Sequence, residues 1–327
     1  MVKSRKPNII DLFAGAGLLS YAFGKEGFDI ICAVELDPVA ARTYVRNIGP
    51  HLHNVDIKKM KPSQECDVLI AGPPCQGFST LGKRNPDDPR NSLCLEVVRW
   101  AKLAEPSVVV IENVAIFLKT PLWSKVVSRL EKLGYNVDGQ VLNAYDFGVP
   151  QNRNRSFTIA SKIGSPDIKS IARRPIRTVR EAWQGLPSKP NGCNFHYSPQ
   201  PSELALARMH IIPPGGDKRD IMKTTPKLAA PSWWNLGQQV TDVWGRMEWD
   251  KPCNTLRTCL QNASKGRYIH PKQNRVISLR EAARLHTIPD SWTFDGTPTQ
   301  IARQIGNSVP PNLGRAVARA VRKVFFD

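Results

Sequence analysis

A single thiol stands directly behind two prolines in the segment IAGPPCQGFST, residues 70–80. Proline fixes its own φ angle and biases the preceding residue toward extended backbone, so Pro73 and Pro74 present Cys75 on a stiff lead. A cysteine that only packs in a core usually lies inside a strand or a helix. The pattern therefore predicts a thiol that is aimed at a substrate, as a nucleophile would be.

A carboxyl group follows at the matching place in the next apolar segment. Residues 66–72 (CDVLIAG) and 106–114 (PSVVVIENV) both read as buried strands, and Cys75 and Glu112 come at their carboxyl ends. The carboxyl ends of parallel strands form one ligand-binding edge, so we expect Glu112 to lie beside Cys75. A thiol next to a carboxyl group is typical of nucleophilic catalysis assisted by an acid.

A glycine-containing turn indicates a nucleotide-type ligand. The turn DLFAGAG (11–17) follows an apolar strand and opens a helix, and Gly15 and Gly17 let the backbone approach a ligand closely. Ser20 stands where a dinucleotide fingerprint has its third glycine, which argues against NAD or FAD and favours a smaller adenosyl ligand. Glu35 ends the next strand, where an acidic residue typically accepts hydrogen bonds from ribose hydroxyl groups.

Alternating strand and helix patterns surround these residues. Strands are expected at 8–13, 29–36, 66–72, 106–114, 135–144 and 155–161, and helices at 18–27, 37–48, near 91–104, at 278–288 and at 312–326. This order predicts an α/β fold with a mostly parallel sheet that helices cover on both faces. The last two strands of the list are expected to form a closing pair.

The charge of the chain is concentrated in its second half. The 327 residues suit two domains, and the formal net charge is +18. Residues 1–150 hold 18 basic and 16 acidic residues, whereas residues 151–327 hold 28 and 12. Periodicity fades from 162 to 275, where proline, glycine, basic residues and tryptophan collect. This indicates a loop-rich domain that binds a polyanion, attached to a nearly neutral domain.

Composition also excludes some classes of protein. No apolar run approaches 18 residues, so no membrane span is expected. The seven cysteines include no Cys-x-x-Cys pair, which argues against a disulfide framework or a zinc site and predicts reduced thiols. The first residues, MVKSRKPNII, have no apolar signal region, so we expect a cytoplasmic protein of a prokaryote.

Six motifs follow one another along the chain: DLFAGAG (11–17), GPPCQGFS (72–79), ENV (112–114), QNRNR (151–155), REAARLHTIPD (280–290) and IGNSVP (305–310). In this order they resemble the motifs of the S-adenosylmethionine-dependent DNA (cytosine-5)-methyltransferases of prokaryotic restriction–modification systems. The resemblance covers nearly the whole chain except about 162–245. It implies a Rossmann-like, mostly parallel, seven-stranded methyltransferase sheet with a smaller, loop-rich, basic target-recognition domain.

The resemblance also implies a domain division. Residues 1–161 and 300–327 would form the catalytic and cofactor-binding domain. Residues 162–275 would form the target-recognition domain, and residues 276–299 a hinge segment.

The family's chemistry gives each catalytic motif a role. Carbon 5 of cytosine is a poor nucleophile until a thiolate adds to carbon 6, and the resemblance makes Cys75 this thiolate. Glu112 would bind or protonate ring nitrogen 3. Arg153 and Arg155 would hold the carbonyl oxygen of the base and lower the pKa of the nearby thiol. Loss of the carbon 5 proton would then expel the thiolate from the methylated base.

The same resemblance assigns binding residues. The cofactor S-adenosylmethionine, which becomes S-adenosylhomocysteine, would contact Phe13, Gly15, Gly17, Leu18, Glu35, Leu36, Asp56, Ile57, Pro74, Asn307 and Ser308. Leu18 replaces a common family glycine, and only a small adjustment of the first helical turn is expected there. Leu36 replaces a residue that is often aromatic and packs on adenine, so weaker cofactor affinity is expected. DNA would contact Gln76, Ser79, Arg246, Arg257, Lys265 and Arg267. No metal is expected.

The implied partner is double-stranded DNA, from which the target cytosine must be flipped out of the stack. We expect a monomer, with a cognate restriction endonuclease acting on the same site. Three other functions stay open. A tRNA cytosine methyltransferase would share these motifs, but its branch carries a Cys-Phe-Thr tripeptide that this chain lacks. A non-catalytic DNA-binding member would not need Cys75, and an amino-methylating enzyme would have an aromatic residue there.

Overall fold

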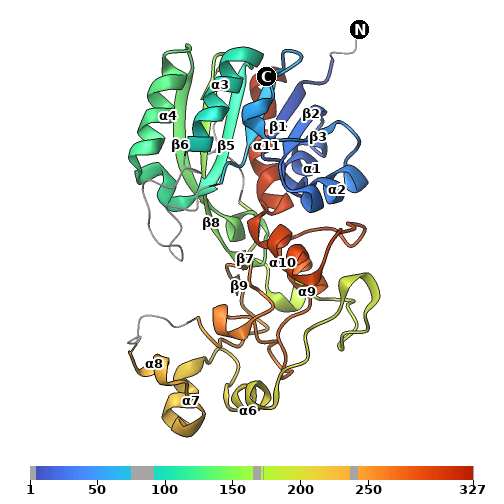
Figure 1. The fold of residues 1–327 in the computed structure, drawn as a ribbon, viewed down its shortest axis with the longest axis vertical. Helices are drawn as coiled ribbons and strands as arrows, with labels where there is room; N and C mark the ends of the chain where they lie inside the picture. Colours follow the sequence, from blue (N-terminus) through green and yellow to red (C-terminus); the bar gives the residue numbers. More distant parts are fainter. Residues whose placement is uncertain (1–4, 75–91, 165–170, 172, 236–241, 327) are drawn as a thin grey trace. The chain divides into compact units, whose positions relative to one another are not determined.

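The computed structural model describes residues 5–74, 92–164, 171, 173–235 and 242–326. The chain divides into two compact units (Figure 1). Unit 1 comprises residues 1–147, 154–174 and 309–327, and unit 2 comprises residues 148–153 and 175–308. Within the described ranges, no helix is both long enough and apolar enough to cross a membrane.

Unit 1 is built on a seven-stranded sheet with the strand order β3-β2-β1-β4-β5-β8-β6. The strands are β1 (Asn8–Leu12), β2 (Asp29–Glu35), β3 (Leu52–Asn54), β4 (Val68–Ala71), β5 (Val108–Val114), β6 (Asn136–Asn143) and β8 (Asn154–Ser161). The first five in this order pair in parallel, whereas β8 pairs antiparallel with both β5 and β6. The mostly parallel, seven-stranded sheet expected from the sequence is confirmed.

Helices cover both faces of this sheet. α1 (Leu18–Gly24), α2 (Pro38–Asn47) and α11 (Pro311–Phe326) lie on one face, and α3 (Cys94–Ala104) and α4 (Pro121–Glu131) lie on the other (Figure 1). Side chains of β1 contact the helices on both faces, because successive side chains of a strand point to opposite faces of the sheet. Ile10 and Leu12 join a buried cluster with Val97 of α3, while Asp11 is hydrogen-bonded to Ser20 of α1.

Local capping chemistry starts α2 where the sequence predicted. The Asp37 side chain accepts hydrogen bonds from the backbone N–H groups of Val39 and Ala40, and Pro38 occupies the first helical turn. Asp at the N-cap and Pro directly after it both favour a helix start, since proline has no N–H to leave unpaired. This turn brings the chain away from the end of β2, where Glu35 lies.

Unit 2 has little regular structure, as the fading periodicity predicted. It contains a two-stranded sheet of β7 (Gln151–Asn152) and β9 (Cys253–Asn254). Its helices are α5 (Val179–Ala182), α6 (Glu203–Ile211), α7 (Lys218–Thr224), α8 (Pro231–Asn235), α9 (Leu279–Leu285) and α10 (Pro298–Asn307). Residues 276–299, expected to be a hinge, and 300–308, expected in the catalytic domain, both belong to unit 2 because α10 packs on α9.

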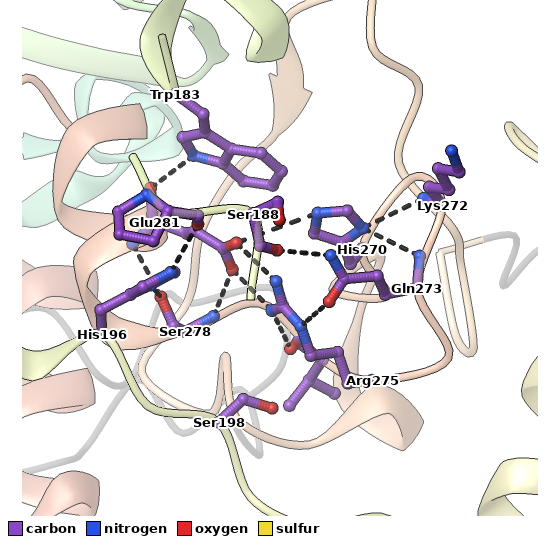
Figure 2. A network of polar contacts seen from close by, with 12 residues as sticks. Trp183, Ser188, His196, Ser198, His270, Lys272, Gln273, Arg275, Ser278 and Glu281 are labelled. Carbon is purple, nitrogen blue, oxygen red and sulfur yellow. Dashed lines mark hydrogen bonds and ion pairs between the residues drawn. The ribbon is translucent and has the colours of Figure 1, made fainter. Parts of the chain in front are cut away.

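A buried ion pair joins Arg275 and Glu281 in unit 2 (Figure 2). The Arg275 guanidinium donates to both carboxylate oxygens of Glu281, at 2.7 and 2.6 Å. The same carboxylate accepts from the backbone N–H of Ser278 at 2.6 Å, which closes a capping box at the start of α9. Burial alone would raise the pKa of Glu281, but the hydrogen bonds and charge of Arg275 hold it below its usual value.

Aromatic rings enclose this ion pair. The Trp183 indole stacks on the His270 ring at a centroid distance of 5.3 Å and donates from Nε1 to the Glu281 carbonyl. His270 Nδ1 accepts from the backbone N–H groups of Lys272 and Gln273, so that nitrogen carries no proton (Figure 2). Burial and, secondarily, the Arg275 charge lower the pKa of His270 to about 4, so the ring is neutral near pH 7.

We expect Glu281→Gln to lower the free energy of unfolding by about 3 to 5 kcal/mol, because it leaves the buried Arg275 guanidinium without its counter-charge. Urea denaturation measures the change. The contribution of the ion pair should be complete above the unfolded pKa of Glu281 and lost as the pH falls through its lower folded pKa. Asp250→Asn, which breaks an exposed pair with Arg180, is the control and should leave the midpoint unchanged. Equal midpoints for the two variants would contradict this role.

Candidate functional site

The turn between β1 and α1 has a backbone that suits close approach by a ligand. Phe13, Gly15 and Gly17 all have positive φ angles, of 58°, 56° and 90°. A Cβ on Gly17 would lie 2.8 Å from the Tyr44 ring, so only glycine fits there. A Cβ on Gly15 would meet nothing within 4 Å, so this side of the turn is open. One glycine therefore serves packing and the other leaves space.

Glu35 holds this turn from the end of β2. Its carboxylate accepts from the backbone N–H of Gly15 at 2.7 Å and from that of Asp37 at 2.7 Å. Burial raises the pKa of Glu35, and the two backbone hydrogen bonds oppose that rise. Each carboxylate oxygen can accept more than one hydrogen bond, so the group keeps capacity for a ligand hydroxyl.

The other cofactor residues expected in unit 1 have different environments. Leu36, directly after β2, is 67% exposed, so a large apolar side chain faces outward beside Glu35. Asp56 caps a short 3-10 helix by accepting from the backbone N–H of Lys58. Leu18 and Ile57 are buried in the core.

The ends of β4 and β5 are joined by an asparagine that sequence reasoning did not single out. Asn113 Nδ2 donates to the carbonyl of Pro73 at 3.2 Å, and its Oδ1 accepts from the backbone N–H of Val114. The side chain thus fixes the prolines that precede the thiol. Cys75, Gln76 and Ser79 lie outside the described residues, and Pro74 is the last described residue before them. Asn113 could have been found from the sequence, because it is the middle residue of the motif ENV, in which only Glu112 was given a role.

Glu112 forms an ion pair with Arg155. The distance between Arg155 Nε and Glu112 Oε1 is 3.1 Å, and the side chains are only 15% and 10% exposed. Register explains the pairing: β5 and β8 are antiparallel, with Glu112 opposite Phe157 and Val114 opposite Arg155, so the two charges are diagonal neighbours on one face. Burial lowers the pKa of Arg155, and the Glu112 charge acts in the opposite direction.

Arg153 is placed differently from Arg155, although only one residue separates them. Its side chain is fully buried in unit 2, and it donates to the backbone carbonyls of Leu256, Gly306 and Ser308 at 2.7 to 3.0 Å. These bonds satisfy carbonyl groups at the C-terminal end of α10 and at Leu256 that would otherwise lack partners. The contact of Arg153 with a base oxygen stays a prediction.

Gln151 is a second structural residue of the same motif. Its Oε1 accepts from the backbone N–H of Leu256, and its Nε2 contacts His286 Nδ1 at 3.0 Å. Ser308, expected to contact the cofactor, uses its carbonyl for Arg153 and His286, whereas the Asn307 side chain is exposed. Both lie in unit 2, whereas the glycine turn lies in unit 1.

Two of the four arginine and lysine residues expected to bind DNA make several hydrogen bonds within unit 2. Arg246 is 4% exposed and donates to the carbonyls of Met209, Ile212, His270 and Gln273 and to the side chain of Asn274. Burial lowers the pKa of Arg246 to about 10. Arg267 donates to three carbonyls and pairs with Asp217. Both guanidinium groups are therefore bonded to acceptors within unit 2, and their contact with DNA stays a prediction.

The remaining two basic residues are accessible. Lys265 is exposed at the end of a short 3-10 helix. The Arg257 side chain is 36% exposed, and its contact with Asp242 is a long one of 3.8 Å. In the described parts of the chain, no group of three His, Cys, Asp or Glu side chains could hold a metal ion.

Comparison with known proteins places these features in one family. The sequence model of the C-5 cytosine-specific DNA methylases matches residues 7–323. Type II methylase M.HgiDII of Herpetosiphon aurantiacus is 32% identical over 337 residues, which cover 96% of this chain and 95% of that protein. Type II methyltransferase M1.HphI of Haemophilus parahaemolyticus is 35% identical and is covered to 86%, again with 96% of this chain.

A solved structure shares the fold. The crystal structure of the S. pombe Dnmt2 methyltransferase has a TM-score of 0.73 at 17% identity, and the alignment covers 98% of this chain and 100% of that one. At this identity the likeness shows the fold alone. The family match spans almost all of both units and includes the glycine turn, the Glu112–Arg155 pair and the buried Arg153. The chain therefore belongs to the C-5 cytosine-specific DNA methylases.

Proposed function

We propose that the chain flips a cytosine out of duplex DNA and methylates its carbon 5 within a short specific sequence, through Cys75 and S-adenosylmethionine. The observation that carries this mechanism is the joined end of β4 and β5. Asn113 ties the backbone just before Cys75 to the strand that bears Glu112, and Arg155 orients the Glu112 carboxylate. A nucleophile and its acid need such fixed relative positions to act on one base.

The residues of the glycine turn fit an adenosyl cofactor. S-adenosylmethionine, when bound, supplies the methyl group. The open space beside Gly15 admits a ligand close to backbone, and Glu35 offers carboxylate lone pairs to ribose hydroxyls. The exposed Leu36 side chain offers an apolar surface to a base. We assign Phe13 and Asp56 to the same site, and we assign no side-chain contact to Leu18 or Ile57.

The catalytic assignments follow from charge and geometry. The Cys75 thiolate would add to carbon 6 of the flipped cytosine, and loss of the proton from carbon 5 would later expel it. Glu112, held by Arg155, would bind ring nitrogen 3 and the neighbouring amino group. The Arg155 cation would also favour the ionised thiol, since nearby positive charge lowers a thiol pKa. Arg153 would act as a positioning residue, because its guanidinium bonds to backbone.

The biological role is argued from the relatives. M.HgiDII and M1.HphI are named as Type II enzymes, and this chain aligns with 95% and 86% of their lengths. We infer that the chain is the modification enzyme of a restriction–modification system, acting as a cytoplasmic monomer beside an endonuclease for the same site. Bisulfite sequencing of plasmid DNA from cells that express the protein tests the product and reveals the sequence. Unmethylated DNA at every cytosine would contradict the proposal.

We expect Cys75→Ser to abolish methyl transfer, with a loss of at least about 10³-fold, because a serine hydroxyl is far less ionised than a thiol. Transfer of radiolabelled methyl groups to DNA measures it. Binding of duplex DNA and of S-adenosylhomocysteine should persist, which separates lost chemistry from lost folding. Cys259→Ser, which changes an exposed thiol elsewhere, is the matched control and should keep full activity. Wild-type activity in Cys75→Ser would exclude this nucleophile.

Covalent trapping tests the same step directly. Fluorine at carbon 5 of cytosine leaves no proton to remove, so the thiolate cannot be expelled after addition and methyl transfer. We expect wild-type protein, S-adenosylmethionine and cognate duplex with 5-fluorocytosine to give a complex that survives a denaturing gel. The Cys75→Ser variant should give none. A wild-type mixture that methylates ordinary cognate DNA yet never yields this complex would contradict the mechanism.

We expect Arg257→Ala and Lys265→Ala each to weaken DNA binding and to reduce the slope of log affinity against log salt by about 1, as loss of one phosphate contact does. Fluorescence anisotropy from low to moderate salt measures this. Lys125→Ala, an exposed change on α4 of unit 1, is the control. Arg246→Met should instead lower the temperature of unfolding, because it leaves buried carbonyls unpaired. Unchanged slopes for both surface variants would remove them from the DNA interface.

A further inference from the structure

Beneath the glycine turn, unit 1 contains a chain of hydrogen bonds that the proposed mechanism does not use. Ser20 Oγ donates to Asp11 Oδ2 at 2.6 Å and lies 3.1 Å from the Tyr44 hydroxyl. That hydroxyl lies 2.9 Å from His51 Nε2. The first three residues are almost fully buried, whereas His51 is half-buried. The series of hydrogen bonds thus extends from the buried Asp11 carboxyl group to the half-buried His51.

These hydrogen bonds connect the two ends of the glycine turn. Asp11 is in β1, just before the turn, and Ser20 is in α1, just after it, so their hydrogen bond joins the two ends of the turn. The Tyr44 ring packs directly against Gly17, 2.8 Å from where a Cβ would be. Glu35 holds Gly15 by a separate hydrogen bond. The turn is therefore fixed by one carboxylate at Gly15 and by a hydrogen-bonded chain beneath Gly17.

Which group donates in each of these hydrogen bonds depends on one proton, that of Asp11. Each hydroxyl has a single hydrogen to donate. When Asp11 is ionised, Ser20 donates to it, Tyr44 must donate to Ser20, and His51 Nε2 must donate to Tyr44. When Asp11 carries a proton on Oδ2, the same distances allow every donor to be reversed, so that Oδ2 donates to Ser20 and Tyr44 donates to His51. A proton at this atom therefore reverses the donors of all three hydrogen bonds without moving a heavy atom.

The surroundings of Asp11 bring its ionisation into the physiological range. Burial, and to a smaller extent the Glu35 charge, raise the pKa of Asp11 to about 7, while the Ser20 hydrogen bond opposes the rise. The neighbouring groups respond in turn: burial and Asp11 raise the pKa of Cys32 to about 11 and raise that of Tyr44 further. Burial lowers the pKa of His51, and Asp29 acts against that effect.

We propose that Asp11, Ser20 and Tyr44 are positioning residues of the cofactor turn, and that ionisation of Asp11 strengthens binding of the positively charged cofactor. The proposal rests on the proposed function of the turn. S-adenosylmethionine carries a sulfonium cation that S-adenosylhomocysteine lacks. A buried carboxylate under the turn attracts that cation through a medium that screens charge less than water does. A ligand that prefers ionised Asp11 binds more tightly as the pH rises through the pKa of that group.

Isothermal titration calorimetry at pH 6, 7 and 8 tests this with both ligands. For the wild-type protein, affinity for S-adenosylmethionine should rise by about threefold to tenfold across this range, since each pKa unit of coupling equals a tenfold change. Affinity for S-adenosylhomocysteine should change much less. Asp11→Asn keeps an acceptor for Ser20 but removes the charge, so its two profiles should both be flat.

The hydroxyl links are tested by a matched pair of tyrosine variants. Tyr44→Phe keeps the ring against Gly17 and removes only the hydroxyl, so cofactor affinity should fall and its pH profile should change. Tyr21→Phe removes a hydroxyl from α1 outside the chain, where the ring lies under the Lys25 ammonium group, and should follow the wild type. Profiles for Tyr44→Phe and Asp11→Asn that match the wild type would overturn the proposal.

Protein stability gives a readout that does not require cofactor. Folded Asp11 keeps its proton up to a pH of about 7, whereas in the unfolded chain it is released near 3.8. The free energy of unfolding attributable to Asp11 should therefore fall as the pH rises between these values, and Asp11→Asn should lose that fall. An identical pH dependence of the free energy of unfolding in the wild type and in Asp11→Asn would contradict the raised pKa of Asp11. Absence of any cofactor binding by wild-type protein would instead contradict the proposed function.

Discussion

Parallel pairing of β2, β1, β4 and β5 is the constraint on which the whole site depends. Parallel strands end at a common edge, so the turn after β1, Glu35 at the end of β2, the prolines after β4 and Glu112 in β5 share one edge of unit 1. Antiparallel β8 then approaches that edge from the opposite direction and begins beside the end of β5. Its first residues bring Arg155 to Glu112. The directions of β5 and β8 thus determine where Glu112 and Arg155 lie.

Much of this arrangement is predictable from the sequence because it depends on local patterns. Short apolar runs predicted the strands of the sheet except β3, and the Asp-Pro pair predicted the start of α2. Apolar patterns did not predict every helix. Neither α4 nor α10 was expected, although Thr120 with Pro121 and Thr297 with Pro298 cap them with the same chemistry.

The hydrogen bonds of the arginines show why the charge of a segment does not by itself identify the residues that bind a ligand. The excess of basic residues in the second half predicts a polyanion-binding domain, but Arg153, Arg246 and Arg267 use their guanidinium groups on backbone carbonyls. Residue type and motif spacing cannot reveal this, because the carbonyls come from segments up to 155 positions away. Only Arg155, paired with Glu112, has the environment that its motif suggested. Part of the net charge of +18 therefore serves folding.

These buried guanidinium groups have a consequence for how unit 2 can diversify. A sheet fixes its strands by a continuous ladder, so an insertion shifts every pair beyond it. In unit 2, arginine side chains reach single carbonyl groups, such as those of Met209 in α6, Leu256 in an irregular segment and Gly306 in α10. The backbone between two such anchors can lengthen or change composition while both anchors persist. A domain built in this way can acquire new exposed loops without rebuilding its core.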